Sequence, residues 1–164
     1  MIIRDAREDD LPEIVDIYNS TVSGRMVTAD TTPVSVKDRT AWFHEHKKGF
    51  RPLWVVEEGG KVIAWLSFQS FYGRPAYLGT AEISVYVAES HRRQGIGRML
   101  LQRAIEYCPG IGVKNLMGFI FAHNAPSIGL FESFGFEQWG YFPRVAVLDG
   151  VERDLAIMGL RIKN

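Results

Sequence analysis

The chain has 164 residues, the size of one ordinary domain, and 46% of them are hydrophobic, as in a typical globular protein. Nineteen Lys and Arg balance nineteen Asp and Glu, so the net charge of zero argues against broad nucleic-acid binding and leaves room only for a local basic patch. The single cysteine, Cys108, excludes an intrachain disulfide and a thiolate-rich zinc site.

No segment of the sequence predicts targeting or membrane insertion. Charge enters at Arg4 and Asp5, so the start lacks the apolar core of a signal peptide. No apolar run approaches the ~18 residues that a membrane-spanning helix needs. Neither an internal repeat nor a linker interrupts the chain. We therefore expect a single domain over residues 1–164 that is cytoplasmic and has no membrane or nucleic-acid partner.

The first third of the chain predicts a short strand, two helices and a long loop between them. Ile2–Arg4 is the candidate strand. A helix opens at Asp10, because Asp caps helix N-termini and the proline that follows is tolerated in the first turn. Ser23–Thr32 carries Gly, Thr and Asp and predicts a loop. Ser35–Lys47 predicts a second helix that its serine can cap.

The middle of the chain predicts a hairpin, a strand and a buried helix. Pro52–Glu57 and Lys61–Phe71 are rich in strand formers and flank a pair of glycines, which is typical of a hairpin. Thr80–Ala88 is a further strand. Gly95–Cys108 has helical spacing with apolar residues nearly all round, which predicts a helix buried against a sheet.

The last third predicts a central strand, a helix and a final hairpin. Leu116–Ala122 is a continuous apolar run, as expected of a central strand. Ala125–Phe134 predicts a helix that ends at Gly135 in a left-handed cap. Gln138–Leu148 and Glu152–Ile162 predict two paired strands that are joined by a turn at Asp149 and Gly150. The alternation of strands and helices favours an α/β or α+β fold.

The most informative segment joins the strand Thr80–Ala88 to the helix that begins at Gly95. Amide N–H groups at a helix start lack partners, and the helix dipole adds positive potential there. Gly95 and Gly97 have no side chains that would keep a phosphate away from these amides. The neighbouring cations that suit a pyrophosphate are Arg92, Arg93 and Arg98.

Two common phosphate motifs do not fit this segment. No Gly-Lys-Ser/Thr follows, so it is not a P-loop. Leu100 stands in place of the third glycine of a dinucleotide fingerprint. A plain helix N-terminus with solvated arginines remains the alternative for these residues taken alone.

Two signatures, in this order, carry a resemblance to a known superfamily. Arg92-x-x-Gly95-x-Gly97 between a strand and a buried helix resembles the acetyl-CoA loop of the GCN5-related N-acetyltransferases (GNAT). Asn124–Phe136 is similar to the second signature of that superfamily, Asn-x-x-(Ser/Ala)-x-x-Leu-Tyr-x-x-x-Gly-Phe. Three further segments resemble the narrower phosphinothricin and methionine sulfoximine N-acetyltransferase family, and they are Ile17–Asn19, Phe71–Tyr77 and Ala81–Val87.

This resemblance implies a fold and an activity. The fold would be the GNAT fold, an α/β (α+β) arrangement with a splayed mixed sheet flanked by helices. The protein would be a homodimer that uses acetyl-CoA as cosubstrate and needs no metal. It would transfer the acetyl group directly, in a ternary complex, to the α-amine of a small amino-acid-like substrate. Phosphinothricin and methionine sulfoximine are examples, and the role would be detoxification.

Glu82 is the candidate catalytic base. It shares one face of its strand with Ser84 and Tyr86, and an acidic residue among strand formers is a local inconsistency of the kind found at functional sites. An edge charge or a partner for an arginine is the alternative. A base is needed because an α-amine is mostly protonated near neutral pH. The resemblance implies that Glu82 is this base and that it acts through water.

The resemblance also implies the substrate contacts. It assigns them to Arg74, Pro75, Ala76, Glu82, Ile83 and Ser84. Arg74 would hold the acidic end of the substrate, since arginine pairs with carboxylates in a bidentate fork. A surface-turn role between Gly73 and Pro75 is the alternative for this arginine. The loop Ser23–Thr32 is a candidate lid over the site.

Cofactor contacts follow from the same resemblance. The backbone of Val85, Tyr86 and Val87 would pair with the pantetheine arm as a strand edge pairs with an added strand. The pyrophosphate would be held by Arg93, Gln94, Gly95, Ile96, Gly97 and Arg98. Asn124 and Ser127 would line the far side, and Asn124 also fits a plain helix N-cap.

Two residues depart from the superfamily pattern. Phe131 stands where many members have a tyrosine that can protonate the leaving thiolate, and Tyr86 and Ser127 are the alternative donors. Ser133 stands where a lysine is common. Two alternative functions therefore remain open beside the amino-acid enzyme: a protein N-terminal or polyamine acetyltransferase, and a non-catalytic acetyl-CoA sensor.

Cys108 is predicted to be a buried structural thiol.

Overall fold

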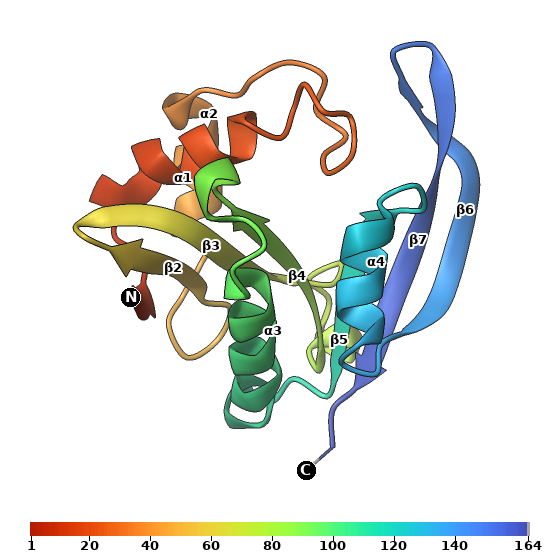
Figure 1. Cartoon of the computed structure of the whole chain (residues 1–164). Coiled ribbons are helices and arrows are strands. Elements are labelled where there is room, and N and C mark those ends of the chain that lie inside the picture. Colours follow the sequence, from red (N-terminus) through yellow and green to blue (C-terminus); the bar gives the residue numbers. More distant parts are fainter. Residues whose placement is uncertain (164) are drawn as a thin grey trace.

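A computed structural model describes residues 1–163 and shows one seven-stranded sheet with helices on both faces (Figure 1). The strands are β1 (Ile2–Asp5), β2 (Leu53–Glu58), β3 (Lys61–Ser70), β4 (Thr80–Val87), β5 (Asn115–Phe121), β6 (Glu137–Leu148) and β7 (Val151–Arg161). The α-helices are α1 (Leu11–Asn19), α2 (Val36–His44), α3 (Ile96–Tyr107) and α4 (Ala125–Glu132). No helix within residues 1–163 is long and apolar enough to cross a membrane.

The sheet is mixed, as the resemblance implied. Its strand order is β1-β2-β3-β4-β5-β7-β6, and every neighbouring pair is antiparallel except β4 with β5, which is parallel. A parallel pair needs a crossover connection, and α3 supplies it between β4 and β5. The final hairpin β6–β7 turns at Asp149 and Gly150, which both have positive φ, and the predicted turn is confirmed.

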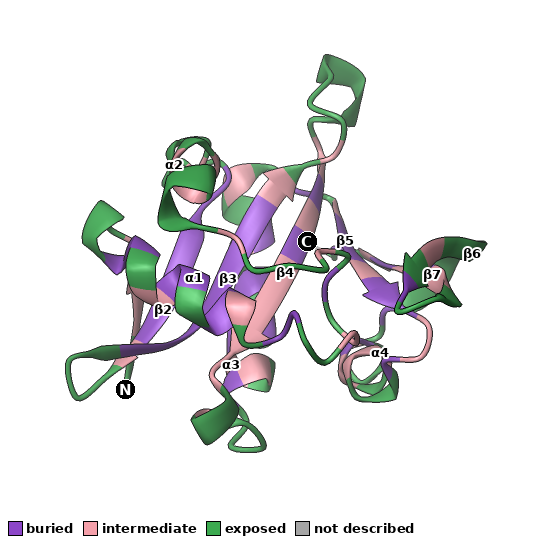
Figure 2. Cartoon of the chain, turned by 90° about the horizontal axis from the view of Figure 1, so that it is seen from above, coloured by how far each residue is buried: buried purple, intermediate pink, exposed green. Residues whose placement is uncertain are grey.

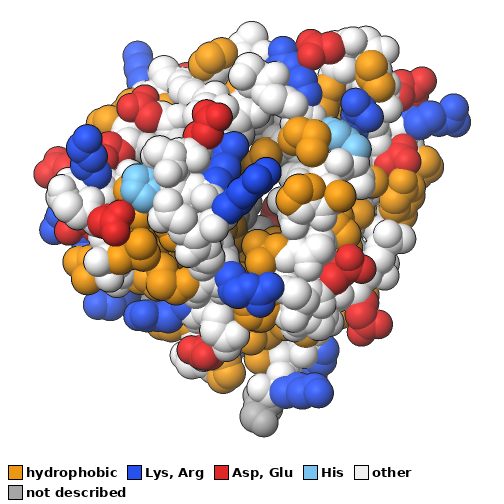
Figure 3. All heavy atoms as spheres, viewed as in Figure 1, with side chains coloured by type: hydrophobic (Ala, Val, Ile, Leu, Met, Phe, Trp, Pro, Cys, Tyr) orange, Lys and Arg blue, Asp and Glu red, His pale blue; other side chains and the backbone are white. Residues whose placement is uncertain are grey.

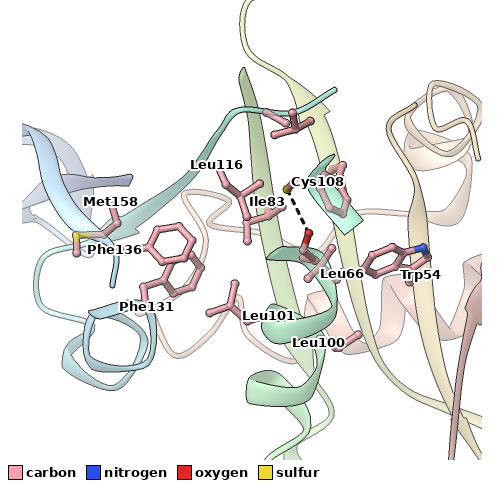
Figure 4. Close-up of a cluster of buried hydrophobic side chains, with 14 of the residues drawn as sticks. Trp54, Leu66, Ile83, Leu100, Leu101, Cys108, Leu116, Phe131, Phe136 and Met158 are labelled. Carbon is pink, nitrogen blue, oxygen red and sulfur yellow. Dashed lines mark hydrogen bonds between the residues drawn. The ribbon is translucent and has the colours of Figure 1, made fainter. Parts of the chain in front are cut away.

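Two hydrophobic clusters occupy opposite faces of the sheet. α3 and α4 cover one face, where Ile83, Leu101, Leu116 and Phe131 meet (Figure 4). α1 and α2 cover the other face, over β2, β3 and β4. The predicted burial of α3 against the sheet is confirmed, and its outer side carries the exposed residues Gln102, Arg103 and Glu106.

The predicted second helix is shorter in the structure. Ser35 and Asp38 form a capping box at its start, and the helix ends at His44 rather than near Lys47. Lys47 and Arg51 pair through their backbones and return the chain to β2, which stops the helix. This early end matters because the turn leaves a cavity between the end of α2 and the sheet.

The sheet splits between β4 and β5. These strands pair only where Thr80–Glu82 meet Asn115–Met117. Beyond that point β4 stays paired with β3 as far as Val87, while β5 stays paired with β7 as far as Phe121. The upper parts of β4 and β5 therefore lie in two separate halves, which is the splay expected from the resemblance (Figure 1).

Candidate active site

The split exposes one edge of β4 in the middle of the sheet. Ala88 donates its N–H to Ile63, and Thr80 accepts from Phe71, so the even-numbered residues turn their backbone groups toward β3 and its continuation. Because backbone groups point to alternate sides along a strand, Val85 and Val87 turn their N–H and C=O groups toward the split, where β5 no longer pairs with β4. Tyr86 faces β3 with its backbone, so two of the three predicted pantetheine contacts lie on the open edge.

The turn after β4 presents unpaired amides at the start of α3. Gly95 adopts φ +79°, which favours glycine, and Arg93 adopts φ +63°. Within residues 1–163 no backbone acceptor is found for the N–H groups of Gly95, Ile96 and Gly97. The side chains of Arg92, Arg93, Gln94 and Arg98 are exposed beside them. Figure 3 shows a hollow between the two halves of this face with Lys and Arg side chains along its rim.

Gly97 has a packing role in addition to its access to ligands. A Cβ atom built there would lie 3.5 Å from Leu130 of α4 and 4.0 Å from Val87 of β4. α3, α4 and the end of β4 therefore meet closely at this glycine. Arg98 joins the same two helices, because its guanidinium donates to Ser133 Oγ at 3.0 Å. Ser133, at the position where a lysine is common, is thus the partner of an arginine.

Glu82 lies at the last residue pair before the split. Its strand partner on β3 is Gln69, and its half-buried side chain lines a cavity of about 340 Å³. Burial raises the pKa of Glu82. The residues around this cavity are Glu45, His46, Phe50, Arg51, Phe68, Gln69, Ser70 and Glu82. A carboxylate with a raised pKa is better matched to accepting a proton near neutral pH.

Tyr86 lies in an aromatic cluster on the α1 side of β4. Its ring stacks on Trp65, with centroids 4.5 Å apart, and lies 5.3 Å from Tyr18. Burial raises the pKa of Tyr86, so its phenol is a poor proton donor. The Tyr18 hydroxyl contacts Thr28 and Asp30 of the loop before α2. Ser84, between Glu82 and Tyr86, is half-buried on the same face.

Within one chain Arg74 is not among the residues that line the cavity beside Glu82. Arg74, Pro75 and Ala76 form an exposed turn after β3. Tyr72 and Tyr77 of the same segment are exposed and pack against Phe71. The side chain of Ile83 points to the α3 side and is buried in the core, which leaves only its backbone for a substrate.

Arg51, which no sequence pattern predicts as a site residue, also lines the cavity beside Glu82. Its side chain is 3% exposed and donates to Ser70 Oγ, Phe50 O and Leu78 O at 2.8–3.1 Å. Burial lowers the pKa of this guanidinium. All three acceptors are neutral, and no carboxylate of the described residues lies within ion-pair distance. Its sequence neighbours gave no signal, because the acceptors come from distant segments.

Asn124 caps α4 and also contacts the loop Ser23–Thr32. Its Oδ1 accepts from the Ser127 amide at 3.3 Å, and its Nδ2 donates to Met26 O at 3.2 Å. The predicted N-cap role is therefore present in a residue that is 6% exposed. Ser127 lies half-buried in the first turn of the helix.

Phe131 is explained by packing. A Cβ atom at Gly118 of β5 would lie 2.5 Å from the Phe131 ring, so the glycine makes room for this aromatic side chain. Phe131 also packs against Phe136 with ring centroids 4.8 Å apart (Figure 4).

Cys108 is buried in the same cluster and donates to Ala104 O, and burial raises its pKa to about 12. The predicted structural thiol is confirmed.

The split sheet, its central edge and the basic turn match a known protein family. The sequence profile of the Acetyltransferase (GNAT) family matches residues 11–136, and the chain belongs to this family. It is 52% identical to YwnH of Bacillus subtilis (strain 168), over 97% of this chain and 98% of that protein, which carries phosphinothricin acetyltransferase as a provisional name.

Two further relatives define the type of enzyme. An L-methionine sulfoximine/L-methionine sulfone acetyltransferase of Pseudomonas aeruginosa is 36% identical over 98% of this chain and 94% of that protein. A GNAT superfamily phosphinothricin acetyltransferase from Sinorhizobium meliloti, solved in complex with AcCoA, has a TM-score of 0.91 at 29% identity, over 98% of this chain and 88% of that one. The chain is an acetyl-CoA-dependent N-acetyltransferase of the phosphinothricin and methionine sulfoximine type.

Proposed function

We propose that this enzyme acetylates the α-amino group of a small amino-acid-like substrate by direct transfer from acetyl-CoA in a ternary complex. The observation that carries the proposal is Glu82, a half-buried carboxylate with a raised pKa at the point where β4 leaves β5. The proposal treats residues 1–164 as a single cytoplasmic domain that detoxifies amino-acid analogues.

The cosubstrate contacts are proposed along the open edge of β4 and at the start of α3. Acetyl-CoA supplies an acetyl group activated as a thioester. The unpaired amides of Gly95–Gly97 bind its pyrophosphate, together with Arg93, Gln94 and Arg98. The backbone of Val85 and Val87 binds the pantetheine arm, and the Val85 N–H polarises the carbonyl oxygen. Asn124 and Ser127 form the opposite wall of the proposed acetyl-CoA cleft.

Glu82 carries the proton chemistry in this proposal. It accepts one proton from the acceptor ammonium, directly or through water, and the neutral amine then attacks the thioester carbon. The C–N bond forms as the C–S bond breaks, and the surplus proton on the amine nitrogen is transferred to the leaving sulfur, so that the product is the neutral amide and the thiol. Ser127 is the proposed relay, because its hydroxyl can take up that proton as it gives its own to sulfur, whereas Phe131 has no hydroxyl and the Tyr86 ring is stacked on Trp65.

The substrate contacts and the assembly are proposed together. Arg74 binds the acidic end of the substrate, with Pro75, Ala76 and Ser84 beside it, although Arg74 is exposed in its own chain. A homodimer fits the apolar surface of β6, whose exposed side chains include Trp139, Tyr141, Phe142, Val145 and Val147.

A thiol-release assay with acetyl-CoA tests the proposal. Phosphinothricin, methionine sulfoximine and methionine sulfone are compared with matched amines that lack the carboxylate, and with polyamines. We expect turnover with the amino acids and far less with the other amines. Acetyl-CoA binding without thiol release from any amine would indicate a sensor instead, and preference for polyamines would contradict the amino-acid assignment.

A further inference from the structure

The loop Ser23–Thr32 reaches from the α1 side of the molecule to the opposite side of the split (Figure 1). Two consecutive carbonyls of this loop are held by two consecutive side chains of the turn between β5 and α4. His123 Nε2 binds Arg25 O at 2.9 Å, and Asn124 Nδ2 binds Met26 O at 3.2 Å. The loop is therefore fastened to the turn that begins α4.

The contact with Arg25 fixes the protonation pattern of the His123 ring. A carbonyl oxygen only accepts, so Nε2 must carry the proton that it donates. Nδ1 of the same ring is buried and has no partner among the described residues. The ring also stacks on Phe121, with centroids 5.5 Å apart and planes at 26°. His123 is thus held by one hydrogen bond and one stacked ring at the end of β5.

Arg25 itself closes the loop. It adopts φ +56°, a conformation that costs energy for a residue with a side chain. Its guanidinium donates to Val22 O and Thr31 O at 3.0 Å, and its Nε pairs with Asp149 in the β6–β7 turn at 3.0 Å. Such a conformation persists where the surrounding contacts hold it, so the loop shape depends on its partners in the C-terminal half.

The other end of the loop lies beside the acceptor side of β4. Asp30 and Thr28 contact the Tyr18 hydroxyl, and Arg39 pairs with Asp30 at 3.2 Å. Tyr18 packs against Tyr86, which shares a strand face with Glu82. A continuous series of contacts therefore links the loop to the strand face that carries Glu82.

The turn at His123 and Asn124 also borders the proposed acetyl-CoA cleft. Asn124 caps α4 through Ser127, and α4 packs against the start of α3 through Leu130 and the Arg98–Ser133 hydrogen bond. The start of α3, the helix α4 and the turn at His123 and Asn124 therefore form one connected wall of the proposed cleft.

We propose that His123 is a positioning residue that couples the two ligands. Through the Arg25 carbonyl it holds the loop Ser23–Thr32 in the conformation that binds the acceptor, and acetyl-CoA favours that conformation by fixing the turn at His123 and Asn124. The inference rests on the proposed function for the identity of the acceptor. Because coupling between two binding sites is reciprocal, the acceptor must also tighten acetyl-CoA binding.

The test compares His123→Leu with His123→Gln in the full-length chain. Leucine removes the donor, whereas the glutamine amide can still reach the Arg25 carbonyl. Trypsin cleavage after Arg25 reports loop release, and it is measured by mass spectrometry with and without acetyl-CoA. Cleavage after Lys48, whose side chain is 81% exposed in the turn after α2, is the internal control. Circular dichroism shows whether each variant is folded.

We expect acetyl-CoA to slow cleavage after Arg25 in the wild type and in His123→Gln, and to have little effect in His123→Leu. The acceptor KM should rise about threefold to tenfold in His123→Leu, as loss of one hydrogen bond allows, while the Kd for acetyl-CoA alone stays within about twofold. A uniform rise in cleavage at Arg25 and Lys48 would indicate general destabilisation and would overturn the proposal.

The proposal is also overturned if His123→Leu keeps both the acetyl-CoA protection of Arg25 and the wild-type acceptor KM. If the wild type releases no thiol with any amine, the proposed function fails, and the protection assay alone then decides whether acetyl-CoA acts on the loop through His123. The two failures are therefore distinguishable, because protection needs only acetyl-CoA and a folded chain.

Discussion

Two strands on opposite sides of the split differ in how they are covered. β3, inside the N-terminal half of the sheet, is buried along most of its length, whereas β6, the edge strand of the C-terminal half, is exposed at most positions (Figure 2). The N-terminal half also carries Glu82 and leads into the basic turn before α3. In our proposal the buried half positions the chemistry and the exposed half provides a surface for assembly.

The largest expected effect tests the buried half at Glu82. Glu82→Gln should lower the rate about 10²–10⁴-fold near neutral pH, where the free amine is scarce. The loss should shrink as pH approaches the pKa of the acceptor amine, because the substrate then arrives deprotonated. Rates measured across pH at saturating acetyl-CoA check this. An equal loss at every pH would mean that Glu82 orients the substrate instead.

The same variant should be more stable than the wild type at neutral pH. The folded-state pKa of Glu82 is raised by burial, so the unfolded chain ionises first as pH rises above the ordinary glutamate pKa of 4.5. Ionisation in the unfolded chain lowers the stability of the wild type in that range, and glutamine removes this loss. Thermal unfolding at pH 4 and pH 7 should show a stabilisation of Glu82→Gln only at the higher pH.

A smaller effect, about a hundredfold on acetyl-CoA affinity, is expected from Gly97→Asp. The new carboxylate would lie at the start of α3, against the phosphates that we place there. Gly97→Ala is the matched control, because its Cβ would make only ordinary contact with Leu130 at 3.5 Å. Calorimetry that finds unchanged affinity in folded Gly97→Asp would remove the pyrophosphate from this site.

Arg74→Ala should raise the KM for amino-acid substrates about tenfold, with a smaller effect on kcat. Arg74 is exposed in its own chain, so a specific effect of this variant on amino-acid substrates would directly support its proposed contact with the substrate. An amine without a carboxylate serves as the comparison substrate and should lose little. If both kinds of substrate are slowed alike, the arginine does not bind the carboxylate.

The smallest effect on stability is expected on the exposed half. Val147 is 62% exposed, so Val147→Lys should change the free energy of unfolding of the monomer by no more than about 0.5 kcal/mol. If β6 forms the proposed dimer surface, the same variant should lower the molar mass measured by light scattering at micromolar concentration. A wild type that is already monomeric would contradict the dimer and leave β6 without this role.

Elements that local chemistry determines were predictable from the sequence. Ser35 caps α2, Gly135 adopts φ +91° after α4, and the Asp149–Gly150 turn closes the final hairpin. Each depends on residues a few positions apart. The splayed sheet came instead from the family resemblance, because no residue pattern shows that β4 and β5 part after Glu82.

Contacts between distant segments were not predictable. Arg51 is held by Ser70 and Leu78, and His123 by a carbonyl of a loop 98 positions away. The sequence marked Phe131 as a departure from the superfamily pattern, but only the structure shows that Gly118 makes space for it. These pairings arise from the folded topology, so neither member carries a signal that its neighbours could reveal.

The unpaired edge of β4 has a consequence for solubility. A strand with free N–H and C=O groups at the rim of a sheet is a template for intermolecular strand addition, and proteins protect such rims with charges, proline or short strands. Here the free edge lies in the interior of the sheet, with β5 on one side and the helices α3 and α4 over it. A foreign strand would have to enter between the two halves of the sheet to reach this edge, where the Val87 carbonyl already accepts from Arg92 Nε at 3.3 Å. The fold thus keeps a hydrogen-bonding edge available in water without the aggregation hazard that an outer edge of the same length would bring.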